Sequence, residues 1–476
     1  MTIQQAAGTA PVTGHTLIGW GYAPGPDFAG LLARADALQA GGATPEAVRR
    51  TLMAERPPAP ATEPLPLRAE GATGFSEIIA AETGDEQANL EKVRETMRML
   101  MRTPTVEAGA VLPDACPSGP VGTIPVGGVV AAREAIHPGM HSADICCSMM
   151  LTDLGTADPK AVLDAASAVT HFGYGGRPNG RRFAVSLHLL DAFRANPFLR
   201  EPRLLQAAQE QMGTQGDGNH FLFVGRSRRT GRTAMVTHHG SRGPGGQLYK
   251  AGKEVAERFR RRLSPETPVQ NGWIPAQSDE GLAYWEALQL IRRWTKANHN
   301  ALHQAVAEAA HAEVGERFWN EHNFVFRRDG LYLHGKGATP AWEGYAADAS
   351  GLTLVPLNMA EPVLVLRGRD RPESLGFAPH GAGRNFTRTE HRRRMGGMTP
   401  EAALARETRG LDIRFLAGPP DASELPSSYK DAASVVRQIE RFGLAEIVDY
   451  IDPYGCIMAG AVPLPWRERK QRRGRG

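Results

Sequence analysis

Side chains able to bind a metal ion or a nucleotide are concentrated in five short segments that lie far apart in the sequence. Together they supply a carboxylate, a thiolate and several imidazoles, a mixed ligand set that suits a borderline divalent ion such as Mn²⁺ or Zn²⁺. A thiolate can also bridge two such ions. The segments are "ADICCSMM" with Asp144 and Cys147, "GDGNHF" with Asn219 and His220, "HHGSRG" with His238, His239 and Arg242, "EHNF" with His322 and Asn323, and "PHGAGR" with His380 and Arg384.

Each segment taken alone has an ordinary structural interpretation. Cys147 is a typical small buried side chain, and a histidine at a strand end, such as His220 or His322, is more often a hydrogen-bonded core residue than a ligand. The presence of all five segments in one chain favours a metal site. The i, i+4 pair His299 and His303 lacks the glutamate of a metalloprotease helix and lies inside a long packed helix, so we interpret it as structural.

The charge pattern admits two interpretations. The net charge is +4, and arginines cluster in "ERFRRRLS" (257 to 264), "RNFTRTEHRRR" (384 to 394) and "WRERKQRRGRG" (466 to 476). Such clusters are either solvated faces or a track for nucleic-acid phosphates, and charge alone does not decide between them. Glycine fingerprints for dinucleotides and the GKS or GKT phosphate loop are absent, but Lys336 in "HGKGATPAW" (334 to 342) is placed between glycines and can meet a phosphate.

Strands and helices that must position these residues are predicted from residue 105 onward. Short β-branched runs that end in glycine, including "TIPVGGVVAA", "HFLFVG", "TAMVTHHG", "GLYLHG" and "VLVLRG", indicate strands followed by turns. The stretch 280 to 314 has the alanines, leucines and tryptophans of a helix that packs on a sheet. Residues 417 to 431 are predicted to form a loop before a last helix and strand. The fold class is therefore α+β, with a mixed sheet and packed helices.

The ends of the chain differ from this core. Residues 1 to 104 are predicted to form a mostly helical segment, with Thr44 as an N-cap before Pro45, a proline-rich spacer at 56 to 71, and a buried apolar stripe at residues 90, 93, 97 and 100. Residues 461 to 476 are expected to be a basic, disordered tail. Four cysteines are too few for a disulfide scaffold, and no membrane-spanning run or signal sequence is evident, so we expect a cytoplasmic protein.

The order of the motifs resembles one family over residues 105 to 460. These motifs are "PDACPSGPVGTIPVGG", "ADICCSMM", "GNHF", "HHGSRG", "EHNF", "GKGAT" and "HGAGR". They are similar to those of the RtcB RNA ligases, which join an RNA 3'-phosphate (or 2',3'-cyclic phosphate) end to a 5'-hydroxyl end. The resemblance implies an RtcB-like core, RNA and a nucleoside triphosphate as substrates, and RNA repair as the role of a divergent paralogue. The RNA that is repaired and the need for an activating protein partner stay open.

The resemblance also implies roles for individual residues. His380 would be the nucleophile that attacks GTP and carries GMP covalently. Asp114 would be an acid beside the site, and Lys336 a further candidate. Two Mn²⁺ ions would be held by Asp144, Cys147, His220, His238 and His322, with Cys147 bridging them. The nucleotide would be bound by Asn219, Asn323, Asn358, Gly381, Ala382, Gly383 and Arg384. RNA phosphates would be bound by Arg242 and Arg388.

Several positions depart from the family pattern. Phe223 replaces a glutamate that contacts guanine, and Met458 stands near the place of a lysine, so GTP selection is in doubt. Asn358 and Ala360 stand where serine and glycine are expected, and Cys146 and Ser148 where glycines are common. Two alternatives to the ligase hypothesis are therefore kept: a metal-dependent phosphodiesterase or phosphatase acting on RNA ends, and a non-catalytic protein that binds RNA ends.

Overall fold

The computed structural model describes residues 11–22, 28–57 and 63–461 of the chain. The chain divides into two compact units, residues 1–65 and 66–476. In the smaller unit, α1 (Gly14–Gly19), α2 (Phe28–Ala40) and α3 (Pro45–Glu55) enclose a small core of their own. The Thr44 hydroxyl accepts a hydrogen bond from the Ala47 amide at the start of α3, which confirms the predicted N-cap.

Residues 66–104 belong to the larger unit, so the boundary between the units falls between residues 65 and 66. The sequence suggested a segment that ends at residue 104. The cause is α4 (Gly84–Met101), whose buried stripe of Leu90, Val93, Met97 and Leu100 packs on the first long strand of the larger unit. The basic tail lies outside the described residues from 462 onward.

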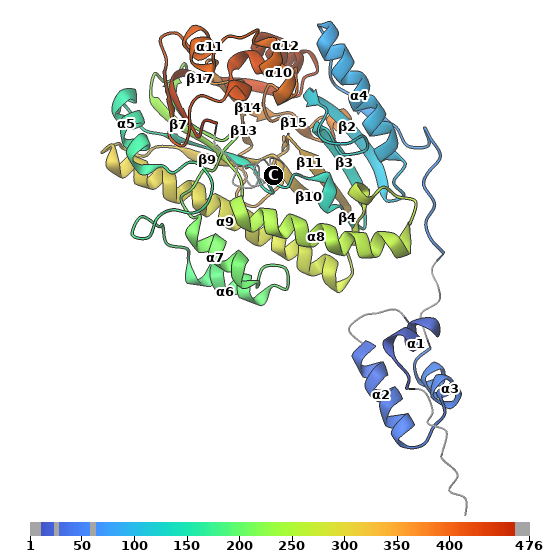
Figure 1. Ribbon diagram of the computed structural model, residues 1–476. Helices are drawn as coiled ribbons and strands as arrows, with labels where there is room; N and C mark the ends of the chain where they lie inside the picture. The colour runs from blue at the N-terminus through green and yellow to red at the C-terminus, as the bar shows by residue number, and fades with distance from the viewer. Residues whose placement is uncertain (1–10, 23–27, 58–62, 462–476) are drawn as a thin grey trace, which may run out of the picture. The chain divides into compact units, whose positions relative to one another are not determined.

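Two sheets form the larger unit (Figure 1). In the five-stranded sheet the order is β1 (Phe75–Glu77), β2 (Val106–Cys116), β3 (Val126–Arg133), β11 (Leu331–Lys336) and β10 (Asn323–Arg328). In the eight-stranded sheet the order is β13 (Leu352–Pro356), β14 (Val363–Gly368), β17 (Ala445–Met458), β6 (Phe221–Ser227), β7 (Thr233–His239), β5 (Ser148–Asp153) and β9 (Arg317–Glu321), with β16 (Asp412–Phe415) also paired to β17. Two short pairs complete the strands: β12 (Ala338–Pro340) with β15 (Phe377–Pro379), and β4 (Ala135–Ile136) with β8 (Ile274–Pro275).

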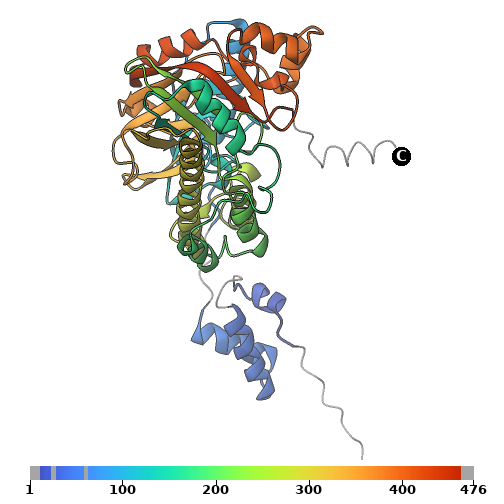
Figure 2. The same ribbon diagram turned by 90° about the vertical axis from the view of Figure 1, so that its left-hand side faces the viewer.

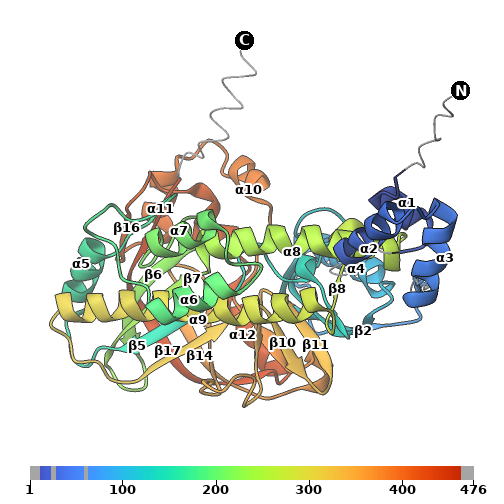
Figure 3. The ribbon, with the colours of Figure 1, turned by 90° about the horizontal axis from the view of Figure 1, so that it is seen from below.

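Helices cover these sheets. The long helices α8 (Arg242–Leu263) and α9 (Asp279–Ala309) run side by side beneath the strands, as Figures 1 and 3 show. The C-terminal helices α10 (Arg388–Arg394), α11 (Pro400–Glu407) and α12 (Ala432–Arg441) lie at the opposite end of the unit (Figure 2). The remaining helices are α5 (Pro159–Val169), α6 (Leu187–Ala195), α7 (Pro202–Glu210) and the 3-10 turns η1 (Pro138–Met140), η2 (Val269–Asn271), η3 (Pro372–Ser374), η4 (Ala422–Glu424) and η5 (Pro426–Ser428).

This architecture confirms the α+β prediction. The predicted strands appear as β3, β6, β7, β11 and β14, and the predicted long helix appears as α9. The segment 417 to 431 is a loop with two 3-10 turns, followed by α12 and β17. All four cysteines are free thiols. No described helix is long and apolar enough to cross a membrane.

Two histidines attach α9 to the eight-stranded sheet. The Thr237 hydroxyl of β7 lies 2.7 Å from His299 Nδ1 and 2.7 Å from His303 Nε2. His299 Nε2 lies 3.0 Å from the Ser148 hydroxyl and His303 Nδ1 2.7 Å from the Thr152 hydroxyl, both on β5. Both imidazoles are fully buried and occupied by these hydroxyls, which confirms their structural interpretation.

Candidate metal and nucleotide site

The five predicted metal ligands converge because strands of the eight-stranded sheet end, or begin, at one place. Cys147 directly precedes β5, His220 directly precedes β6, and His238 lies near the end of β7. In the register of the sheet, His238 pairs with Met149, two residues after Cys147, and with Phe221, the residue after His220. His322 occupies the single position between β9 and β10.

The loop that carries Asp144 and Cys147 is tied to the β9–β10 connection. The Cys146 amide donates to the Asn323 carbonyl at 2.7 Å, and the His322 amide donates to the Cys147 carbonyl at 2.9 Å. Cys146 has φ 57°, the left-handed region that favours glycine. A Cβ at position 240 would come within 2.0 Å of Asp144 Oδ1, so the carboxylate depends on a glycine there.

The ligand atoms form two groups of three that share one sulfur atom. One group is Cys147, His238 and His322, and the other is Asp144, Cys147 and His220; within each, the ligand atoms lie within 4.8 Å of one another. Cys147 Sγ lies 3.1 Å from His238 Nε2 and 3.6 Å from His220 Nε2. Each group could hold a metal ion, and Cys147 belongs to both groups.

Hydrogen bonds fix which histidine nitrogens face the centre. His220 Nδ1 lies 2.6 Å from the Gln215 carbonyl and His238 Nδ1 lies 3.1 Å from the Asn219 carbonyl. A carbonyl only accepts, so each Nδ1 carries the proton and each Nε2 presents a lone pair. His220 Nε2 lies 2.9 Å from Asp144 Oδ2, which is also an acceptor. Lone pairs that converge in this way repel one another unless a cation lies between them, so the donor set fits a metal centre.

The protonation states agree with this fit. Burial, reinforced by the neighbouring His220 and His380, lowers the pKa of His238 well below its ordinary value, so its imidazole is neutral. Burial, with the negative charge of Asp144, raises the pKa of the Cys147 thiol well above that of a free cysteine. A bound cation would favour the thiolate and so reverse the shift of Cys147.

His380 lies beside this centre and is oriented by Asp114. Its ring centroid is 4.8 Å from that of His322. Asp114 Oδ2, on β2, accepts from His380 Nδ1 at 2.6 Å and from the His380 amide at 3.1 Å. Asp114 is fully buried, and a Cβ at position 383 (φ 75°) would lie 2.2 Å from its carbonyl oxygen, so glycine at 383 permits this approach. With Nδ1 held, His380 Nε2 keeps its lone pair for chemistry.

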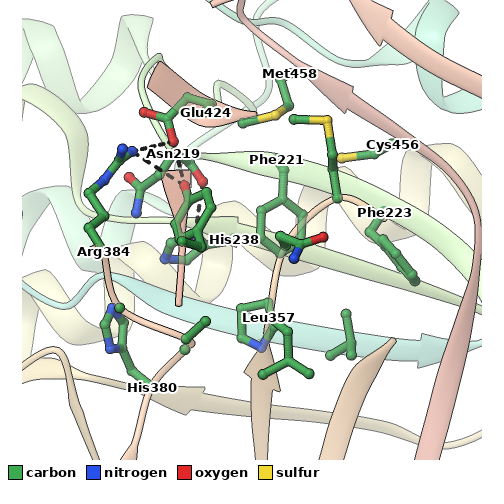
Figure 4. Close-up of a pocket in the computed structure, with 18 of the residues that line it drawn as sticks. Asn219, Phe221, Phe223, His238, Leu357, His380, Arg384, Glu424, Cys456 and Met458 are labelled. Atoms are coloured by element: carbon green, nitrogen blue, oxygen red, sulfur yellow. Dashed lines mark hydrogen bonds and ion pairs between the residues drawn. The ribbon is translucent and has the colours of Figure 1, made fainter. Parts of the chain in front are cut away.

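A pocket opens next to His380 (Figure 4). Six of the seven predicted nucleotide-binding residues line it: Asn219, Asn358, Gly381, Ala382, Gly383 and Arg384. The departures Phe223 and Met458 line it as well. The seventh, Asn323, is not among its lining residues; its side-chain oxygen accepts from the Gly337 amide at 2.7 Å, and its Nδ2 lies 3.5 Å from the Asp144 carbonyl.

The basic candidates surround the centre in different ways. Arg242 begins α8 with φ 53°, and its buried Nε has no hydrogen-bond partner among the described residues. Arg388 is half-exposed and lies 3.0 Å from the Glu424 carboxylate. Lys336 is turned away from the pocket lining: its Nζ donates to the Ser118 hydroxyl at 2.8 Å and to the Ile124 carbonyl at 3.0 Å. Burial lowers the pKa of Lys336 to about 8.

The sequence interpretation missed several lining residues, among them a carboxylate and a phenol that contact Arg384. Glu424 and Tyr429 come from the segment predicted only as a loop, and nothing in their spacing marks them. The Glu424 carboxylate accepts from Arg384 Nη2 at 2.6 Å and from the Tyr429 hydroxyl at 2.5 Å, and the Arg384 guanidinium lies 4.9 Å from the centre of the Tyr429 ring. Glu424 therefore fixes the position of Arg384 at the edge of the pocket.

Comparison with known proteins gives a consistent result. A family model described as tRNA-splicing ligase RtcB matches residues 192–459. RNA-splicing ligase RtcB of Mycobacterium tuberculosis is 28% identical over 288 residues, which cover 54% of this chain and 66% of that protein. tRNA-splicing ligase RtcB of Archaeoglobus fulgidus is 27% identical over 306 residues, 55% of this chain and 62% of that protein. That of Thermococcus kodakarensis is 26% identical over 407 residues, 70% of this chain and 84% of that protein.

The chain thus spans a little less than two thirds of the mycobacterial and Archaeoglobus relatives. The family-model match nevertheless covers more than half of the chain and includes His220, His238, His322 and His380. On that match, the chain belongs to the RtcB family.

Proposed function

We propose that this protein is an RNA ligase that joins a 3'-phosphate (or 2',3'-cyclic phosphate) end to a 5'-hydroxyl end through a covalent histidine–nucleotide intermediate, in RNA repair. The observation that carries the proposal is the placement of His380 between the shared ligand cluster and a pocket. Asp114 holds Nδ1, so that Nε2 is the free nitrogen, and the ring lies beside His322. Family membership supplies the expected substrates.

The residues divide the chemistry among them. His380 Nε2 would attack the α-phosphorus of a nucleoside triphosphate, forming an N–P bond as the bond to the β-phosphate oxygen breaks and pyrophosphate leaves. Asp114 would stabilise the positive charge that develops on the ring. An oxygen of the RNA 3'-phosphate would then take the nucleotidyl group and release His380. The 5'-hydroxyl would finally attack the 3'-phosphorus, with loss of the nucleoside monophosphate.

One ion would be held by Asp144, Cys147 and His220, and the other by Cys147, His238 and His322. We propose that both ions are Mn²⁺. Two such ions supply positive charge that offsets the phosphates. Arg384 and Arg388, both anchored by Glu424, would meet phosphate oxygens at the pocket edge, because a guanidinium can bind them in bidentate fashion.

The test is covalent labelling followed by ligation. The purified full chain is incubated with Mn²⁺ and each α-labelled nucleoside triphosphate, and acid-labile label on the protein is counted. It is then given RNA with 3'-phosphate and 5'-hydroxyl ends. His380→Ala should abolish both signals, whereas His188→Ala, which changes an exposed histidine of α6, should leave both unchanged. Release of inorganic phosphate or of a cyclic phosphate end without labelling would instead support a phosphodiesterase or phosphatase.

A further inference from the structure

The pocket beside His380 is chemically divided. Figure 4 shows the polar side chains of His380, Arg384, Glu424 and Asn219 on one side and apolar side chains on the other. We infer that the apolar side of the pocket binds the nucleobase and offers no hydrogen-bond acceptor to the N–H donors of guanine. The pocket therefore takes ATP at least as readily as GTP. This inference rests on the proposed function, which places a nucleotide here. The apolar wall is formed by Phe221, Phe223, Leu357, Met359, Cys456 and Met458.

The strands that build this wall offer no polar groups toward a base. In the pairing of β6 with β17, Phe223 faces Cys456 and Phe221 faces Met458, so the backbone of both strands belongs to the sheet. Phe223 and Cys456 are each 1% exposed and Met458 is 4% exposed. Phe221 packs against the sulfur-bearing side chains of Met359, Cys456 and Met458. Together with Phe223 they offer stacking and dispersion contacts, which every base accepts.

The carboxylate in the lining is already used. Both oxygens of Glu424 face cations: Oε2 accepts from Arg384 and from Tyr429, and Oε1 lies 3.0 Å from Arg388. The Glu424 side chain is 1% exposed. Oε1 has no hydrogen bond but is fully buried beside Arg388, so the carboxylate holds the two arginines and does not face a base.

Asn358 lies in the sequence between two residues of the apolar wall, Leu357 and Met359. Its Oδ1 accepts from the Ala360 amide at 2.9 Å, which leaves its Nδ2 as a donor. On the Watson–Crick edge, guanine carries two donor groups, N1–H and N2–H, beside its O6 acceptor, whereas adenine carries one donor group, N6–H, beside its N1 acceptor. The Asn358 Nδ2 donor can meet the acceptor of either base, but guanine buries one more donor group without an acceptor, and each such group lowers affinity roughly tenfold.

The experiment compares the four ribonucleoside triphosphates at limiting concentration with the full chain and Mn²⁺. Adduct formation with ATP should equal or exceed that with GTP, and a GTP preference above about tenfold would overturn the inference. Asn358→Asp is isosteric and adds an acceptor while still accepting from the Ala360 amide. It should raise the GTP to ATP ratio by about tenfold, and an unchanged ratio would overturn the assigned edge. Phe223→Leu, the matched control for stacking, should weaken all four nucleotides alike.

A second measurement separates this inference from the proposed function. If no triphosphate labels the protein, the ligase proposal fails, and equilibrium binding of fluorescent ATP and GTP to His380→Ala then decides the base preference. ATP binding at least as tight as GTP binding supports the inference. Tighter GTP binding, or binding of neither nucleotide, overturns it.

Discussion

Replacing Asp114 by asparagine tests how much the charge behind His380 contributes. Asp114 Oδ2 accepts from both the His380 ring and the His380 amide. The amide N–H should keep the asparagine oxygen turned toward the ring, so the geometry is retained and only the negative charge is lost. A hydrogen bond to a charged partner contributes about 1.5–3 kcal/mol. At about 1.36 kcal/mol per decade, Asp114→Asn should slow adduct formation by about 10- to 150-fold.

The assay is the single-turnover rate of acid-labile labelling by an α-labelled triphosphate, with metal content measured in parallel. Asp114 belongs to neither ligand group, so metal content should stay at the wild-type level. Asp191→Asn, an exposed carboxylate on α6, is the matched control and should label at the wild-type rate. A rate within about threefold of wild type in Asp114→Asn would refute the orienting role, because that is less than 1 kcal/mol.

The remaining predictions concern the nucleophile, the bridging thiol and acid stability. His380→Ala should lose labelling completely while its metal content and melting temperature stay close to wild type, and surviving label would exclude it as the nucleophile. Cys147→Ala should lose bound metal because both ligand groups share its sulfur. Cys456→Ala, which removes another buried thiol, should retain its metal. Full metal occupancy in Cys147→Ala would contradict the shared-ligand role of Cys147. Burial lowers the pKa of His137 to about 4 and of His299 to about 3. An unfolded histidine has a pKa near 6.5, so below that pH the unfolded chain binds more protons than the folded protein. The free energy of unfolding is therefore highest above about pH 6.5 and falls toward pH 3, by about 2 kcal/mol per histidine at pH 5. Equal urea midpoints at pH 7 and pH 5 would contradict this.

The sequence was most informative where a residue type has few uses. Cysteine and histidine beside glycine mark strand ends, and the motif order placed the ligands before any geometry was known. The structure brings all five predicted ligands into the two groups that share Cys147. The β-branched runs likewise located β6 and β7, because alternation and length are local properties.

Long-range pairing could not be predicted in the same way. Glu424 acquires its role only because the loop after β16 returns to the pocket and meets Arg384. The boundary between the two units depends on where α4 packs, which a proline-rich spacer does not reveal. Asn323 was expected at the nucleotide, but its amide is engaged by Gly337 and the Asp144 loop, a contact that no local pattern encodes.

The hydrogen bonds between α9 and the sheet have a single direction. Arg317 Nε can only donate, and it donates to the Thr152 hydroxyl at 2.8 Å. The His239 carbonyl can only accept, so His299 carries its proton on Nε2 and its Nδ1 accepts from the Thr237 hydroxyl. Because Thr237 has then donated its one proton, it accepts from His303 Nε2–H, and His303 Nδ1 accepts from the Thr152 hydroxyl. His299 Nε2–H then reaches the Ser148 hydroxyl and the His239 carbonyl. The His239 carbonyl at one end thus sets the tautomer of two neutral histidines, and changing the tautomer of either ring would require every proton in this chain of hydrogen bonds to move together.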